Sequence, residues 1–197
     1  MDSFLLALAW ATFYGLHSIL ASTPIKKKLN LSQRNYRLCY NAVALTSLSA
    51  VLWVHFGLAS PTIFTRTIAT DIIGFGLIVG GLWVHFLTFQ QLSIHAFLGI
   101  LPEVQGDLVA KGIYAYLRHP IYLGILLIML GLMLLQPITS NLISLLVTLL
   151  YLPFGIRFEE QKLIAEFGDT YQQYCKKVPS LFPRLSKFAH SQKSDKN

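Results

Sequence analysis

A run of polar and aromatic residues interrupts an otherwise apolar chain, and its spacing suits the binding of a charged ligand. Pro120 begins an apolar segment and stands at a first-turn position, where a helix tolerates proline. The start of this helix would present unpaired backbone N–H groups and the positive end of the helix dipole, with Arg118 and His119 just before it. This arrangement predicts an anion-binding site. An interfacial aromatic belt with a snorkelling arginine is the alternative interpretation.

Two carboxylates, Glu159 and Glu160, follow the last apolar segment of the chain. Carboxylates close to hydrocarbon need a partner, and the ammonium or the ribose hydroxyls of a ligand would provide one. Acidic residues that complement the dipole at a helix start are the alternative. Glu159 is expected to face the ligand, whereas Glu160, one residue later on a helix, is expected to turn away by about 100° towards the head groups.

Long uncharged intervals predict the helices that position these residues. The chain has 197 residues, of which 54% are hydrophobic and 13% charged, so it is too apolar for an ordinary soluble domain. Asp, Glu, Lys and Arg are absent from residues 3–25, 38–65, 72–102 and 119–156. A spanning helix needs about 20 residues, so the first three intervals hold one span each and the last holds two. The expected spans are residues 4–21, 38–58, 72–91, 121–135 and 138–156.

An amphipathic helix is expected after the last span. Apolar side chains recur there at helical spacing around Gly168, which predicts a helix that lies on the membrane and can fold over the start of the fourth span. The expected fold is therefore an all-α integral membrane protein with about five transmembrane helices and a C-terminal amphipathic interfacial helix. Residues 1–185 are expected to form one domain, with a catalytic core at about 93–185, and residues 186–197 a polar flexible tail.

The distribution of basic residues predicts the orientation in the membrane. Of the 16 Lys and Arg residues, only Arg66 falls in a segment that lies outside when the N-terminus is outside. The positive-inside rule thus places the C-terminus in the cytosol. The net charge of +7 indicates anionic lipid as the partner and no nucleic acid, because the basic residues flank spans. The histidines and cysteines lack metal-ligand spacing, so no metal is expected. The oligomeric state is left open.

Several of these motifs occur together in a known family. The run from Gly112 to Gly124, the following apolar hairpin, the Glu159-Glu160 pair and the segment from Phe167 to Pro183 resemble the isoprenylcysteine carboxyl methyltransferases, which are integral membrane enzymes. This resemblance covers about the last 90 residues. The N-terminal part, with the run from His17 to Ala21, is more weakly similar to membrane methanethiol S-methyltransferases. Phospholipid N-methyltransferases share the architecture more loosely.

The resemblance implies S-adenosylmethionine as the cofactor and assigns site residues. It implies one wall of the cofactor pocket made of Asp107, Leu108, Val109 and Tyr114, another made of His119, Pro120, Ile121 and Tyr122, and a polar anchor at Glu159. The substrate-binding arginine of that family corresponds to Gly155 here, and Arg157 could replace it. The expected catalytic residues are Arg118 and Arg157. The expected acceptor is a small or lipophilic thiol or carboxylate that resembles isoprenylcysteine.

The chemistry implied by the resemblance requires few catalytic groups from the protein. Methyl transfer from a sulfonium is an in-line displacement, so holding the acceptor near the methyl carbon and excluding water supply most of the acceleration. No general base stands out in the sequence, which favours an acceptor that is anionic or ionises easily.

A different class of function is the alternative. Histidines within spans are functional candidates, and His17 with His85 could ligate haem in a membrane redox or sensor protein. A histidine that bonds a neighbouring helix is the commoner case.

Overall fold

The computed structural model describes residues 2–92 and 108–183, and the regular elements in these two ranges are helical. In chain order they are α1 (Asp2–Ala21), α2 (Thr23–Leu29), α3 (Gln33–Gly57), α4 (Ile68–Phe89), the 3₁₀ turn η1 (Gly112–Ala115), α6 (Pro120–Leu135), α7 (Thr139–Phe167) and α8 (Asp169–Lys177). Helices α1, α3, α4 and α7 are long and apolar enough to cross a membrane, and α6 is a shorter apolar helix of 16 residues. The expected all-α membrane fold is confirmed, with α6 as its shortest expected span.

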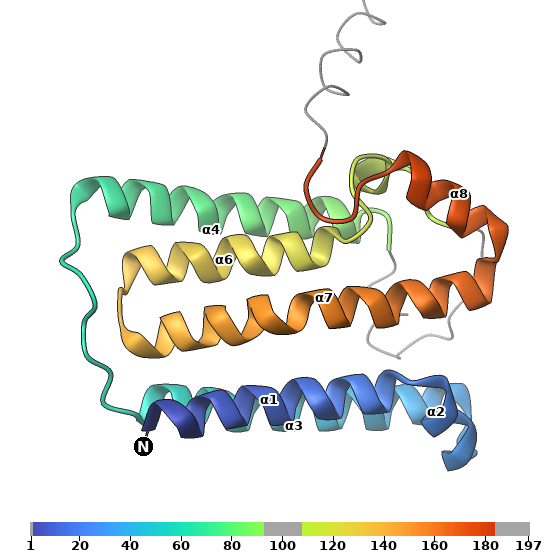
Figure 1. Cartoon of the computed structure of the whole chain (residues 1–197), viewed down its shortest axis with the longest axis horizontal. Helices are drawn as coiled ribbons and strands as arrows, with labels where there is room; N and C mark the ends of the chain where they lie inside the picture. The colour runs from blue at the N-terminus through green and yellow to red at the C-terminus, as the bar shows by residue number, and fades with distance from the viewer. Residues whose placement is uncertain (1, 93–107, 184–197) are drawn as a thin grey trace, which may run out of the picture.

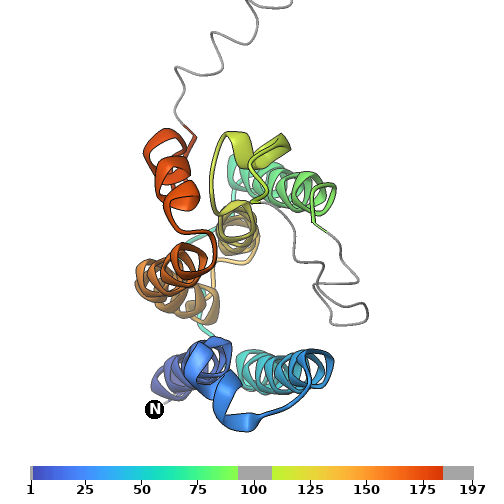
Figure 2. The same ribbon diagram turned by 90° about the vertical axis from the view of Figure 1, so that its right-hand side faces the viewer.

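The five long helices lie side by side with their axes roughly aligned. Figure 1 shows α4, then α6, then α7, then the pair of α1 and α3, and the end-on view in Figure 2 keeps the same order. The short elements α2, η1 and α8 gather at one end of this bundle (Figure 1). The polar run before α6 and the last turns of α7 lie at this same end, so the fold brings the two predicted polar segments together.

Glycines bring α4 and α6 into backbone contact. A Cβ at Gly81 would lie 2.7 Å from the carbonyl oxygen of Gly124, and a Cβ at Gly131 would lie 2.5 Å from that of Gly74. In both helices the two glycines are seven residues apart, which is about two helical turns. They therefore lie on one face of each helix, and these two faces contact each other. Small residues allow close backbone approach between helices in lipid, where no hydrophobic force drives association. This contact fixes α6, and with it the site at its start, against α4.

Hydrogen bonds between side chains hold α1 against α7. Trp10 Nε1 donates to Ser144 Oγ at 2.8 Å, and the hydroxyls of Tyr14 and Thr148 lie 2.7 Å apart. The partners on each helix are four residues apart, so they occupy consecutive turns of one face. Because both helices run in the same direction, the bonds stay in register along the pair.

Helix α7 extends eleven residues beyond the expected span end at residue 156. It continues to Phe167 because residues 157–167 include neither glycine nor proline, and it ends at Gly168, whose φ of 57° lies in the left-handed region that glycine tolerates. Glu159 and Glu160 therefore lie inside this helix and not at a helix start. The amphipathic segment after Gly168 forms α8, which turns back over the start of α6 as expected (Figure 1).

Candidate active site

An ion pair joins the segment before α6 to the last third of α7. The Arg118 Nη2 lies 2.6 Å from the Glu160 Oε1, and Arg118 Nε donates to the same oxygen at 2.9 Å. The Arg118 side chain is 11% exposed and that of Glu160 is 22% exposed, so water screens the pair only in part. The two residues fix the start of α6 against α7.

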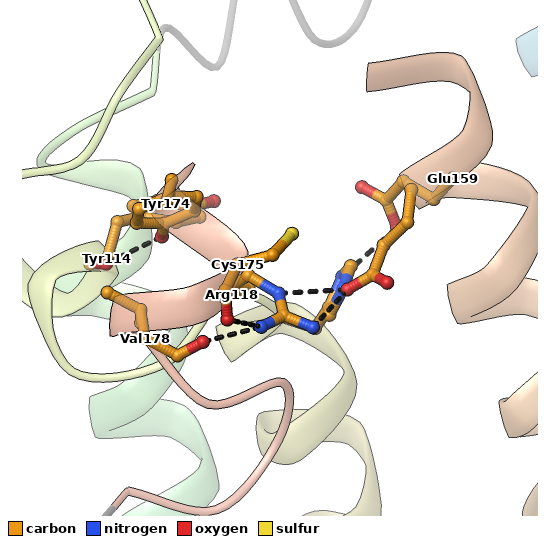
Figure 3. Close-up of polar contacts among 8 residues, drawn as sticks. Tyr114, Arg118, Glu159, Tyr174, Cys175 and Val178 are labelled. Atoms are coloured by element: carbon orange, nitrogen blue, oxygen red, sulfur yellow. Dashed lines mark hydrogen bonds and ion pairs between the residues drawn. The ribbon is translucent and has the colours of Figure 1, made fainter. Parts of the chain in front are cut away.

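Arg118 also holds α8 in place. Its Nη1 donates to the carbonyl oxygens of Cys175, at 3.0 Å, and Val178, both at the C-terminal end of α8 (Figure 3). The backbone N–H groups of Arg118 and His119 donate to the carbonyls of Pro179 and Ser180, each at 3.0 Å. Each guanidinium nitrogen of Arg118 thus already donates to a protein oxygen.

His119 connects the two glutamates. This histidine is buried, and its ring lies with Nε2 3.0 Å from the Glu160 Oε1 and Nδ1 3.5 Å from the Glu159 Oε2. Burial lowers the pKa of His119, but the two carboxylates outweigh burial and leave the pKa above its usual value. The imidazolium form is therefore favoured here, and it shares its charge between both carboxylates.

Glu160, and not Glu159, points into this network. The face of α7 that packs against α6 carries Leu152 and Ile156, and Glu160 continues it one turn later. The expectation that Glu160 turns towards the head groups is therefore wrong. Glu159 lies on the adjacent face, with its side chain 47% exposed, and keeps a carboxylate accessible beside His119 (Figure 3).

Tyrosines of α8 cover the segment that precedes α6. Tyr171 and Tyr174 are buried and pack with Val178 against Leu108. The Tyr174 hydroxyl donates to the carbonyl oxygen of Tyr114 at 2.6 Å (Figure 3). Burial raises the pKa of Tyr174 to about 12, so its hydroxyl remains a donor at neutral pH. The sequence indicated an amphipathic helix here but not which residues it covers.

The remaining predicted residues fall in three places. Leu108, Val109, Tyr114, Pro120, Ile121 and Tyr122 lie on the approach to α6 or in its first turn. Tyr122 stacks on His119 with ring centroids 5.6 Å apart.

Arg157 is exposed on α7 and pairs with no other residue in the described ranges. Asp107 lies outside the described residues. Gly155 is buried, and a Cβ there would lie 2.9 Å from the ring of Tyr151.

The two histidines that could ligate haem lie on different helices, which are separated by α6 and α7. His17 is on α1 and bonds the Tyr40 hydroxyl, whereas His85 is on α4 and bonds the Gly81 carbonyl at 2.8 Å. Helices α6 and α7 lie between α1 and α4 in both views (Figures 1 and 2). The structure therefore does not bring these rings together. Within residues 2–92 and 108–183, no group of histidine, cysteine and acidic side chains is arranged to hold a metal.

Comparison with known families shows to which family the chain belongs. The family model described as phospholipid methyltransferase matches residues 69–170, about half of the chain, so the chain belongs to that family. The match includes all of α4 except its first residue and the whole of α6 and α7, and the last two helices carry residues of the site described above. No solved structure matches the chain significantly.

Three relatives show how the similarity is distributed. The protein-S-isoprenylcysteine O-methyltransferase of Schizosaccharomyces pombe is 48% identical over 79 residues, which cover 40% of this chain and 34% of the relative. Methanethiol S-methyltransferase 1 of Bradyrhizobium diazoefficiens is 29% identical over 89% of this chain and 65% of the relative. The protein-S-isoprenylcysteine O-methyltransferase of Saccharomyces cerevisiae is 28% identical over 89% of this chain and 76% of the relative.

The matched regions of the first two of these relatives are about one third and just under two thirds of their lengths. The relation to both kinds of methyltransferase that the sequence motifs indicated is confirmed.

Proposed function

We propose that this protein is a membrane methyltransferase that uses S-adenosylmethionine. The observation that carries the proposal is the accessible carboxylate of Glu159, held beside the buried His119 where α6 begins, in a chain of the phospholipid methyltransferase family. The acceptor is a small or lipophilic thiol or carboxylate, since the relatives are named for isoprenylcysteine and methanethiol.

The residues present fit this cofactor. S-Adenosylmethionine carries an ammonium, ribose hydroxyls, a carboxylate and an adenine ring. Glu159 can bind the ammonium or the hydroxyls, and Tyr122 offers an aromatic face. The Ser180 Oγ is buried and has no hydrogen-bond partner in the described part of the chain, so it is a further polar atom that a ligand can satisfy. The first-turn amides of Ile121 and Tyr122 suit the ligand carboxylate.

Arg118 and Arg157 take different roles in this proposal. Arg118 positions the site, because its donors already bind Glu160 and the end of α8. Arg157 is exposed on α7, two residues before Glu159, and suits the anionic part of an acceptor or a lipid head group. A single domain over residues 1–185 is part of the same proposal, as are an outside N-terminus and a cytosolic C-terminus.

The chemistry follows from the position of the site. When bound, the cofactor supplies an electrophilic methyl group on a sulfonium. The protein contributes by holding the acceptor in line with that methyl and by excluding water, for which α8 is placed over the approach to α6. The sides of the site that α8 does not cover face helices within the lipid. A lipophilic acceptor can therefore enter from the bilayer without crossing water.

Titration of S-adenosylmethionine into protein in nanodiscs tests the proposal. Glu159→Gln should weaken binding by about ten- to a hundredfold, because a charged hydrogen bond in a partly buried site contributes about 1.5–3 kcal/mol. Glu166→Gln, an exposed glutamate near the end of the same helix, is the matched control and should bind like the wild type. Equal affinity for all three proteins would remove the role of Glu159. Absence of binding to the folded wild type would contradict the proposed function.

A further inference from the structure

Exposed basic residues gather at the turn between α1 and α3, at the end of the bundle where α8 also lies (Figure 1). Lys26 and Lys28 on α2 and Arg34 in the first turn of α3 are exposed. None of these three forms an ion pair with an acidic side chain within residues 2–92 and 108–183. We call the three residues, together with Leu29 and Leu31 between them, the basic corner. The proposed active site uses none of them.

The chain holds the basic corner in a defined shape. Asn30 ends α2 with a φ of 46°, in the left-handed region that asparagine adopts more readily than most residues, and Ser32 caps the start of α3. The buried Tyr36 donates its hydroxyl to the carbonyl oxygen of Leu20 and so ties α3 to the end of α1. The Lys26 Nζ lies 6.0 Å from the centroid of the Tyr36 ring, within reach of a cation–π contact. A folded turn therefore presents the basic side chains together.

This part of the chain supplies no acidic residue to neutralise the basic corner. Residues 3–70 contain no Asp or Glu, whereas residues 26–37 contain five Lys and Arg. Asp2 and Asp71, which flank the first range, lie in the first turns of α1 and α4, at the opposite end of the bundle (Figure 1). Like charges held this close repel one another, and an anion that binds among them relieves the repulsion. The basic corner therefore favours an anionic ligand.

Exposed leucines indicate which kind of anion fits. The Leu29 and Leu31 side chains are 48% and 43% exposed and follow Lys28 along the turn. Apolar side chains beside basic ones are typical of segments at the membrane surface, where leucine contacts acyl chains and lysine or arginine reaches the phosphates. Free phosphate or a soluble acidic protein would leave both leucines in water. A lipid satisfies the charged and the apolar part of the corner together.

We propose that the basic corner binds the head group of an anionic phospholipid in the leaflet on this side of the membrane. Lys28 and Arg34 donate to the phosphate, Lys26 adds its charge, and the leucines contact the acyl chains. The net charge indicates anionic lipid in general, and the corner names the residues that bind it. The lipid is a bound ligand and not the methyl acceptor. This inference does not depend on the proposed function, because the corner precedes residues 69–170, which match the methyltransferase family, and lipid binding needs neither cofactor nor acceptor.

Lipid binding to the full-length protein in detergent tests the inference. Native mass spectrometry gives the dissociation constant for the first bound molecule of phosphatidylglycerol, which is anionic and carries no amine, and of phosphatidylcholine, which has no net charge. The variant with Lys26→Gln, Lys28→Gln and Arg34→Gln should bind phosphatidylglycerol about a hundredfold more weakly than the wild type, because each basic residue near anionic lipid contributes about fivefold. Binding of phosphatidylcholine should change little in the same variant.

A second triple variant is the matched control. Lys111→Gln, Lys162→Gln and Lys176→Gln remove the same charge from exposed residues before η1, on α7 and on α8, at the same end of the bundle (Figure 1). This variant should bind phosphatidylglycerol nearly as tightly as the wild type. Equal losses in the two triple variants would mean that total charge and not the basic corner attracts the lipid, and would overturn the inference.

Other results would overturn the inference as well. Equal affinity of the wild type for the two lipids would exclude recognition of the anionic head group. Release of phosphatidylglycerol by inorganic phosphate at the same concentration would show that the corner binds phosphate from any source, and binding of polyglutamate without binding of phosphatidylglycerol would assign it to an acidic protein. If the first triple variant does not fold, Lys28→Gln and Lys111→Gln repeat the comparison one charge at a time, with a loss of about fivefold expected only for Lys28→Gln.

Discussion

Arg118 and Glu160 are 42 residues apart in the chain and form an ion pair of 2.6 Å at the point where α6, α7 and α8 meet. Through Arg118 the pair also fixes the C-terminal end of α8, and through His119 it reaches Glu159. The Glu160 carboxylate therefore holds the site together, and the Glu159 carboxylate stays accessible within it.

Removing the Glu160 charge should destabilise the protein. Glu160→Gln leaves the nearly buried Arg118 guanidinium without its counter-ion, so the free energy of unfolding should fall by about 1.5–3 kcal/mol. Thermal unfolding in detergent micelles measures this loss. Glu166→Gln, on an exposed part of the same helix, should leave the melting temperature unchanged. A Glu160→Gln variant as stable as this control would show that the pair does not hold the site together.

The contact between α4 and α6 should tolerate no side chain at its centre. Gly81→Ala places a Cβ 2.7 Å from a backbone oxygen of Gly124, and such overpacking costs about 1–3 kcal/mol. Gly80→Ala meets nothing within 4 Å and should be neutral or stabilising by up to about 1 kcal/mol, through helix propensity. Melting temperatures of the two variants compare the neighbouring positions directly, and the same shift in both would argue against close packing here.

Sequence reasoning predicted the helices well because their signal is local. Uncharged intervals placed all five long helices, and Pro120 correctly started α6. The predicted end of α7 at residue 156 was too early. The polar residues after residue 156 suggested a membrane interface, but the helix continues through them to Phe167. The spacing of seven between Gly74 and Gly81 recurs in α6, but only the packed structure shows that the two pairs of glycines face each other.

The site was predicted less completely because its contacts join distant segments. That Glu160 faces α6 depends on how α7 is rotated, and Leu152 and Ile156 set that rotation only once α6 is packed against them. The bond between Tyr40 and His17 joins two spans, and no periodicity within one helix reveals it. Adjacent glutamates could be recognised as functional, but their different roles required the packed bundle.

The stability that His119 contributes should depend on pH with a defined sign. Its folded pKa lies above its unfolded value near 6.5, so its contribution is fully present below about pH 6.5 and is lost as the pH rises through the folded pKa. The melting temperature difference between wild type and His119→Gln should therefore shrink as the pH rises above about 6.5 and through the folded pKa. A difference that grows over this interval would mean that His119 is neutral in the folded protein.

The orientation in the membrane should follow the basic residues. Helix α2 with its lysines lies at the same end as Arg118 and α8, so one face of the bundle carries most of the positive charge (Figure 1). Reporter fusions after Ser60 and after Leu185 should report opposite compartments, with the second in the cytosol. The same compartment for both fusions would contradict an odd number of spans between these two points.

Methyl transfer itself is the most direct test of the proposed function. Purified protein in nanodiscs is incubated with S-adenosylmethionine labelled in its methyl group and with small thiols, isoprenylcysteines and lipid amines in separate reactions. We expect a labelled methylated product from a thiol or an isoprenylcysteine, and loss of that product in Glu159→Gln at a cofactor concentration that saturates only the wild type. Folded wild-type protein that binds S-adenosylmethionine but transfers label to none of these acceptors, or only to lipid amines, would contradict it.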